Sequence, residues 1–208
     1  WQDFGMPQAP DLRVCVAVAL ETGEPMSRWS IRLERLGDAP VAAVSFPRLQ
    51  GIAPQERETL AVPIWMGEYT THIRELLGAK EEGSRRFEWE YPGLLSLQCL
   101  AFYQENGPGL YLASDDTAAY RKHFAVTCAG GAGLEIVHFP EQTAAHAKDF
   151  TLPYHVLAGA FQGDWITAAE RYRGWALSQP WANNSRLRSG QVPGWVTDTG
   201  LWVWNRGR

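Results

Sequence analysis

The sequence YPGLLSLQCLAFYQENGPGLYLASDD, residues 91–116, decides the fold, because it predicts two antiparallel strands joined by a tight turn. Apolar side chains fall on both faces of the first strand, so we expect both faces to be covered. The turn at residues 104–109 contains Asn, Gly and Pro, which favour a reversal of the chain. The returning strand, residues 110–113, ends at an acidic pair, Asp115 and Asp116.

Short extended segments dominate the chain on both sides of this hairpin. Alternating or β-branched patterns predict strands at 12–20, 29–33, 41–46, 59–65, 87–91, 120–128, 134–139 and, interrupted by Pro153, 150–161. Pro47 is expected to stop one of them, and Pro63 to make another an edge or a strand end. One or two helical turns are predicted at 70–77. Together these patterns predict an all-β fold, an antiparallel β-sandwich over residues 1–162.

The pattern changes after Gly163. Asp164 is a good N-cap, and apolar residues then recur at helical spacing up to Pro180, so residues 163–194 are expected to form a linker helix and a connector. Residues 200–205 predict a new strand. Since a strand needs neighbours, we interpret residues 195–208 as the start of a further domain that begins with this orphan strand.

Composition excludes several classes of function. The chain of 208 residues is 45% hydrophobic and 20% charged, as in globular proteins, and its net charge of −4 with scattered Lys and Arg argues against a nucleic-acid partner. No apolar run approaches the roughly 20 residues that span a bilayer, which argues against a membrane protein. The three cysteines, Cys15, Cys99 and Cys128, are interpreted as buried free thiols. Neither compartment nor oligomeric state is predicted.

The sequence contains no convincing catalytic set, metal site or cofactor motif. Glycoside cleavage needs two carboxyl groups roughly 5–9.5 Å apart, whereas neighbouring strand residues such as Asp115 and Asp116 point to opposite faces. A turn-forming role is favoured for this pair, although Asp115 is also a candidate to hold a sugar hydroxyl or to brace the sandwich. The five histidines lack metal-ligand spacing.

One cluster has the composition of a sugar site. Trp65, Met66, Glu68 and Tyr69 follow a predicted strand closely. An aromatic ring stacks on the apolar face of a pyranose, and a carboxylate accepts hydrogen bonds from its hydroxyls. Trp65, Glu68 and Tyr69 are therefore candidate substrate-binding residues, although most Trp residues of sandwiches are core residues.

Several motifs together resemble the N-terminal region of certain large glycoside hydrolases. They are Phe46-Pro47, Leu49-x-Gly51-Ile52, Tyr91-Pro92-Gly93, Leu97-Gln98, Gly109-Leu110-Tyr111-Leu112-Ala113-x-Asp115 and Gly163-Asp164-Trp165-x-x-Ala168-Ala169-x-x-Tyr172-Arg173-x-Trp175. In such proteins, which include the endo-α-N-acetylgalactosaminidase and α-galactosidase groups, a galactose-mutarotase-like supersandwich precedes a (β/α)8 barrel.

The resemblance implies that residues 201–205 form the first barrel strand. Because active sites of such barrels lie at the C-terminal ends of the strands, Trp202, Trp204, Asn205 and Arg206 would lie near the mouth of a sugar pocket. The catalytic carboxylates of these enzymes come from later strands.

Three hypotheses of function follow. The first is a non-catalytic sandwich region of a glycoside hydrolase that acts on carbohydrate, packing against and supporting its barrel. The second is a stand-alone carbohydrate-binding module, which needs aromatic platforms and no acid–base pair. The third is a mutarotase-like sugar epimerase, which requires a His and a Glu that converge in one pocket.

Overall fold

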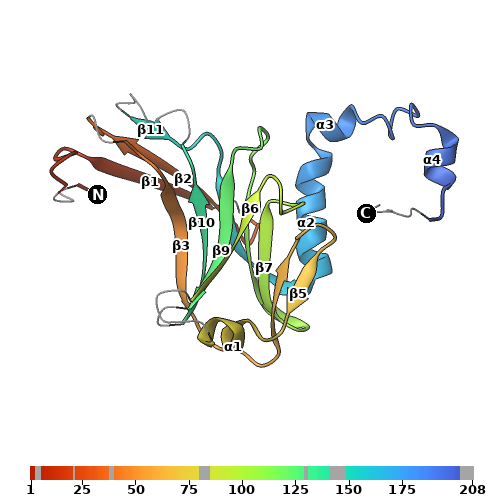
Figure 1. Cartoon of the computed structure of the whole chain (residues 1–208), viewed down its shortest axis with the longest axis horizontal. Helices are drawn as coiled ribbons and strands as arrows, with labels where there is room; N and C mark the ends of the chain where they lie inside the picture. The colour runs from red at the N-terminus through yellow and green to blue at the C-terminus, as the bar shows by residue number, and fades with distance from the viewer. Residues whose placement is uncertain are drawn as a thin grey trace, which may run out of the picture. The chain divides into compact units, whose positions relative to one another are not determined.

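The chain is an all-β antiparallel sandwich followed by helices, as the sequence predicts (Figure 1). The computed structural model describes residues 1–2, 6–20, 22–37, 40–79, 85–128, 131–140 and 149–201. These residues belong to two compact units, 1–170 and 171–208. The first unit contains both sheets.

The larger sheet has eight strands and carries the predicted hairpin at its centre. In spatial order its strands are β1 (Arg13–Leu20), β2 (Met26–Glu34), β12 (Val156–Gly163), β8 (Gly107–Ser114), β7 (Cys99–Gln104), β4 (Glu58–Val62) and β5 (Glu68–Thr70), with β11 (Phe150–Thr151) also paired to β2. The smaller sheet has the order β3 (Val44–Ile52), β10 (Ala132–His138), β9 (Lys122–Cys128) and β6 (Arg86–Tyr91).

The hydrophobic core lies between the inner faces of the two sheets. Its fully buried members include Leu60, Leu100, Leu112, Phe124, Val126, Leu134, Ile136 and Val156. In the hairpin, Leu100 lies opposite Leu112 and Ala101 lies opposite Tyr111. Side chains alternate along a strand, so Leu100 and Ala101 point to opposite faces of the sheet. Both faces of β7 are buried, as its sequence predicts. The strand begins only at Cys99, because the residues from 92 to 98 form turns and bends apart from Leu95, which makes an isolated β-bridge with Ile64.

Two predictions about prolines have different outcomes. Pro63 does end β4, which stops at Val62. The expectation that Pro47 stops a strand is wrong, because β3 continues through Pro47 to Ile52. β3 is an edge strand, and its register against β10 shifts between Glu135 and Val137, where Pro47 falls. A proline is tolerated in such a place because no ladder hydrogen bond requires its missing N–H.

Four helices accompany the sheets in the part of the chain that the structure describes. The predicted helical turns are α1 (Ile73–Gly78), and the predicted capped helix is α2 (Trp165–Leu177). Two short helices were not predicted: α3 (Pro180–Asn183) lies in the expected connector, and α4 (Gly194–Asp198) lies almost wholly in the segment 195–208 that was expected to start a further domain. Gly200 and Leu201 are not in a strand, and the rest of the predicted orphan strand lies outside the described residues. Among the described residues, no helix is long and apolar enough to span a bilayer.

Candidate functional site

A hollow of the sandwich unit lies on the outer face of the larger sheet, where α2 begins. This pocket of about 410 Å³ is bounded by β4, β5, β7, the segment before β7 and the first turns of α2. Its lining residues are Ala61, Val62, Pro63, Trp65, Met66, Gly67, Glu68, Tyr69, Ser96, Leu97, Cys99, Ala101, Trp165, Ala168 and Ala169.

Small side chains create this pocket. Ala61 pairs with Ala101 across β4 and β7, and both are among the lining residues. Ala168 and Ala169 approach from the helix, so no large side chain fills the space between sheet and helix at this point. The floor is therefore wide and apolar, which is the character of a surface that receives an apolar group.

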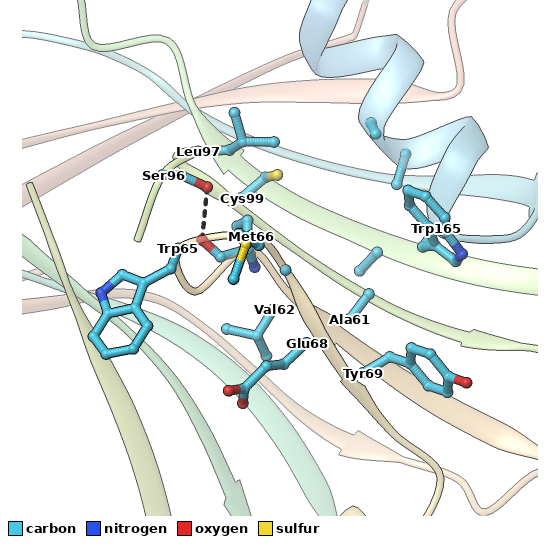
Figure 2. A pocket seen from close by; sticks show the side chains of 15 residues that line it. Ala61, Val62, Trp65, Met66, Glu68, Tyr69, Ser96, Leu97, Cys99 and Trp165 are labelled. Carbon is cyan, nitrogen blue, oxygen red and sulfur yellow. Dashed lines mark hydrogen bonds between the residues drawn. The ribbon is translucent and has the colours of Figure 1, made fainter. Parts of the chain in front are cut away.

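Large exposed side chains form the rim of the pocket. Trp65, Met66, Tyr69 and Trp165 have exposed fractions of 67%, 98%, 70% and 51%. Trp65 and Gly67 both have positive φ, 50° and 100°, in the turn between β4 and β5, and the Gly67 amide donates to the Ile64 carbonyl at 2.7 Å. Figure 2 shows Tyr69 and Trp165 on the helix side, whereas the Trp65 indole points away from both.

The predicted aromatic and acidic cluster is thus gathered at one pocket, but its side chains diverge. Tyr69 pairs with Ala61 on the outer face, whereas Glu68 pairs with Val62, whose side chain belongs to the core face. Consecutive residues of β5 point to opposite faces, so the Glu68 carboxylate and the Tyr69 ring do not face one another. A role for Trp65, Glu68 and Tyr69 in substrate binding stays a prediction.

The polar groups inside the pocket are few and occupied. The Ser96 hydroxyl donates to the Pro63 carbonyl at 2.9 Å (Figure 2). Burial raises the pKa of the Cys99 thiol to about 12, although a hydrogen bond with Tyr111 acts in the opposite direction. The thiol is therefore protonated at neutral pH and is a poor nucleophile there. Of the three cysteines, Cys99 is buried as expected, whereas Cys128 is partly buried and Cys15 is exposed.

Asp115, the remaining described candidate, ties strands together. One carboxylate oxygen accepts from the His155 amide at 2.7 Å, and the other lies 2.9 Å from Arg28 Nη1 and 3.2 Å from His155 Nδ1. These contacts join the end of β8 to β2 and to the start of β12. They agree with a bracing role inside the sandwich.

Asp116 points into the protein and meets a buried cation that sequence reasoning missed. The Lys122 side chain is fully buried, and its Nζ lies 2.6 Å from Asp116 Oδ2, 3.1 Å from Gln98 Oε1 and 2.7 Å from the Tyr120 carbonyl. Asp116 also accepts from the Ala118 and Tyr120 amides, so it shapes the predicted turn. Burial lowers the pKa of Lys122 to about 8, although Asp116 acts in the opposite direction.

A buried histidine lies opposite Lys122 in the pairing of β10 with β9. His138 Nε2 is 2.7 Å from the Phe46 carbonyl, which only accepts, so this nitrogen carries the proton. Nδ1 therefore accepts from the Tyr154 hydroxyl, also at 2.7 Å. Burial lowers the pKa of His138 to about 4. Both ring nitrogens are occupied, which makes His138 a structural residue.

A histidine and two glutamates converge on the outer face of the smaller sheet. His123 Nδ1 is 3.3 Å from Glu88, and Nε2 is 3.9 Å from Glu90. Hydrogen bonds from Arg86 and Arg121 lower the pKa of Glu88 and of Glu90, respectively. Both carboxyl groups are thus held ionised, whereas a general acid needs a raised pKa.

No cluster of three or more metal-ligating side chains occurs in the part of the chain that the structure describes. Trp202, Trp204, Asn205 and Arg206 lie outside those residues, so their proposed place near a sugar pocket stays a prediction.

Comparison with known proteins places part of the chain in a family model. A family described as "Domain of unknown function (DUF6259)" matches residues 150–208, which run from β11 to the end of the sequence and include all of α2. No curated protein matches the chain.

Proposed function

We propose that this chain is the non-catalytic β-sandwich region of a glycoside-hydrolase-like protein, and that it packs against and supports a (β/α)8 barrel that carries the catalytic carboxylates. The observation that most supports this proposal is the apolar pocket beside α2 with its exposed rim of Trp65, Met66, Tyr69 and Trp165. Large exposed apolar patches on soluble proteins mark surfaces that contact another protein surface, a ligand or a membrane.

The pocket suits a protein surface better than a sugar. A sugar site needs several polar groups directed at the hydroxyls. Here the Ser96 hydroxyl is bound to a backbone carbonyl, and Glu68 lies on the other face of β5 from Tyr69. An apolar side chain of a neighbouring domain needs no such partners, and it would cover the rim at the same time.

The engaged carboxylates of the sandwich also support a non-catalytic role. Asp115 is held by Arg28 and His155, and Asp116 by Lys122. Glu88 and Glu90 are held by arginines on the outer face of the smaller sheet. The pKa values of Glu88 and Glu90 are lowered, whereas a general acid needs a raised pKa. The same reasoning makes the mutarotase-like alternative the weakest, despite the approach of His123 to Glu88.

The second candidate function is a stand-alone carbohydrate-binding module that uses the same pocket. The exposed rings of Tyr69 and Trp165 favour it, because aromatic platforms are what such modules need. Calorimetric titration with galactosides, glucans and xylans separates the two candidates. A supporting sandwich gives no binding heat, whereas a module gives heat that is lost in a Tyr69→Ser and Trp165→Ser double variant.

The reading frame beyond codon 208 tests the proposal directly. We expect it to continue with alternating strand and helix patterns and with carboxylates at strand ends. In the product of the complete gene, Trp65→Ser with Tyr69→Ser should lower the melting temperature and the glycosidase activity. Trp1→Ser, which alters an aromatic residue that is 76% exposed and not part of the pocket, serves as the control. A stop codon directly after codon 208, or sugar binding by this chain alone, would contradict the proposal.

A further inference from the structure

Charge is unevenly distributed between the two compact units. Residues 1–170 contain 13 basic and 22 acidic residues, whereas residues 171–201 contain four Arg and one Asp. We refer to residues 171–201 as the basic segment. The overall net charge of −4 therefore combines an acidic sandwich unit with a basic segment. A surface of one sign of charge attracts a partner of the opposite sign.

The composition of the basic segment is that of a protein–protein interface. It contains four Arg, three Trp and one Tyr, but neither Lys nor Glu. Relative to other protein surfaces, interfaces are enriched in Trp, Tyr and Arg and depleted of Lys and Glu, and the same three enriched residue types dominate the binding energy. This composition favours a surface that another protein surface covers over one that stays in water.

Aromatic side chains of the basic segment gather where α2 ends and α3 begins. The ring centroids of Tyr172 and Trp175 lie 5.2 Å apart, and those of Trp175 and Trp181 lie 5.7 Å apart in an edge-to-face arrangement. The Gln179 side chain donates to the Trp175 carbonyl at 3.0 Å, which ties the start of α3 to the end of α2. Trp181 is 47% exposed, so the cluster presents a large apolar ring to its surroundings.

Two arginines that follow this cluster have no carboxylate partner in the part of the chain that the structure describes. Arg188 Nη1 donates to Asn183 Oδ1 at 3.1 Å, which places one guanidinium group against α3. Arg186 forms no ion pair with a described residue, and Leu187 between the two arginines is 65% exposed. In the sandwich unit, by contrast, ion pairs hold Arg28, Arg32, Arg48, Arg74, Arg86 and Arg121.

We propose that the basic segment docks on an acidic surface of the barrel, with Trp181 as its apolar anchor and with carboxylates of the barrel opposite Arg186 and Arg188. This inference rests on the proposed function, and it adds to the pocket a second contact of different chemistry. Charge complementarity argues for this partner, because guanidinium groups bind carboxylates through paired hydrogen bonds and complementary charge fixes which surfaces meet.

The sandwich unit is a poorer partner for the basic segment, although it is acidic. Its carboxylates Glu58, Glu88, Glu90 and Glu135 already lie in ion pairs with arginines of the same unit. An arginine of the basic segment that docked there would compete with these pairs. We therefore expect the acidic partner surface to belong to the barrel, and not to this sandwich or to that of a second copy.

Hydrogen exchange in the product of the complete gene tests this contact. Arg186→Glu should make the α3 amides exchange about tenfold faster, because the reversed charge faces carboxylates. Arg186→Lys keeps the charge and should keep most of the protection. Arg13→Glu serves as the matched control, since Arg13 is an exposed arginine of the sandwich unit without a described carboxylate partner, and it should leave α3 unchanged. Unchanged exchange of β7 to β10 verifies that each variant is folded.

Salt gives a second readout without any substitution. Raising the salt concentration from about 0.1 M to about 1 M shortens the screening length from about 10 Å to about 3 Å. Exchange of the α3 amides in the wild-type product of the complete gene should therefore become faster. In the 208-residue chain the same amides should exchange fast at both salt concentrations, because the acidic partner surface is absent.

The possible results separate this inference from the proposed function. If a barrel follows and Trp65→Ser with Tyr69→Ser lowers the melting temperature, but protection of α3 resists Arg186→Glu and salt, the inference alone is overturned. Salt-sensitive protection of α3 already in the 208-residue chain would also overturn it, and would assign the contact to the acidic sandwich of the same or of a second copy. A reading frame that ends at codon 208 would overturn both.

Discussion

Lys122 shows how one residue organises the interior at the end of the sandwich. Removing an ammonium group from water costs several kcal/mol unless its donors are satisfied. Here Asp116, Gln98 and the Tyr120 carbonyl accept its hydrogen bonds, and the rings of Tyr91 and Tyr154 lie 4.9 and 4.6 Å from Nζ. The charge is therefore fully compensated by groups from several separate segments, which the network holds together.

Breaking this ion pair on one side should destabilise the fold strongly. Asp116→Asn leaves the buried ammonium without a counter-charge, and we expect a loss of about 3–5 kcal/mol in the free energy of unfolding. Asp116→Asn combined with Lys122→Met should recover much of that loss, because no buried charge remains. Urea unfolding of the single and double variants measures the effect.

The exposed pair Arg121–Glu90, 2.6 Å apart, provides a control for the buried pair. Its removal by Arg121→Ala should change the stability by no more than about 1 kcal/mol. Equal losses for Asp116→Asn and Arg121→Ala would show that burial of the Asp116–Lys122 pair has no energetic consequence.

His138 makes stability depend on pH. Its pKa is lowered from 6.5 to about 4 in the folded protein, so the unfolded chain binds the proton more readily. The contribution of the neutral His138 side chain to the free energy of unfolding is fully present above pH 6.5, the pKa in the unfolded chain. It is lost as the pH falls towards 4, the pKa in the folded protein. By linkage this amounts to about 3 kcal/mol.

The variant His138→Gln tests this dependence, because a glutamine can donate to the Phe46 carbonyl and accept from the Tyr154 hydroxyl without titrating. Chemical unfolding measured between pH 4 and pH 7 should give a flatter stability curve for this variant than for the wild type. Identical slopes would assign the pH dependence to other groups.

At the level of elements, alternation of side chains was sufficient to predict most strands. The patterns at residues 12–20, 29–33 and 87–91 correspond to β1, β2 and β6. β5 was missed because three residues are too few to show a period. β3 was predicted to end at Pro47, because a proline usually interrupts a strand and the local sequence does not show which strands lie beside it. An edge position with irregular register is a tertiary feature, which the local sequence does not contain.

The functional-site residues were predicted less completely than the strands, because the register of strand pairing determines which side chains lie on the same face. Proximity in sequence placed Glu68 beside Tyr69, but the pleat of β5 separates their side chains. The burial of Lys122, by contrast, could have been predicted from the sequence. It lies in phase with Phe124 and Val126, which marks it as an inward residue. Its partners Asp116 and Gln98 come from other segments, and only the folded chain brings them together.

The helix that covers the outer face depends on its cap. Asp164 Oδ1 accepts from the Ile166 and Thr167 amides at 2.9 and 3.3 Å. Asp164→Ala should therefore lower the free energy of unfolding by about 1 kcal/mol, whereas Asp164→Ser should retain most of it, since serine also caps helices well. Thermal unfolding followed by circular dichroism measures both. A larger loss for serine than for alanine would contradict the capping role.

The two compact units of the molecule differ in how many of their side chains are buried. Residues 1–170 contain all of the strands that the structure describes and the whole hydrophobic core cluster. Among residues 171–201 no residue is buried. Trp181, Leu187 and Trp195 there are 47%, 65% and 66% exposed. Such a segment gains little from the hydrophobic effect, and in the proposed whole protein these side chains would be covered by the barrel.

Hydrogen exchange should resolve this difference within one chain. Amides of β7, β8, β9 and β10 lie around Leu100, Leu112, Phe124 and Ile136, and they should exchange only through global unfolding. Amides of α3 and α4 should exchange many-fold faster, because local opening there exposes no buried side chain. Mass spectrometry of peptic fragments after timed exchange provides the measurement, and the product of the complete gene provides the comparison.

In that longer protein α3 and α4 should become protected while the β7–β10 fragments stay unchanged. Equal protection of α3 and α4 in both proteins would mean that the barrel does not cover them, and it would remove this segment from the proposed interface.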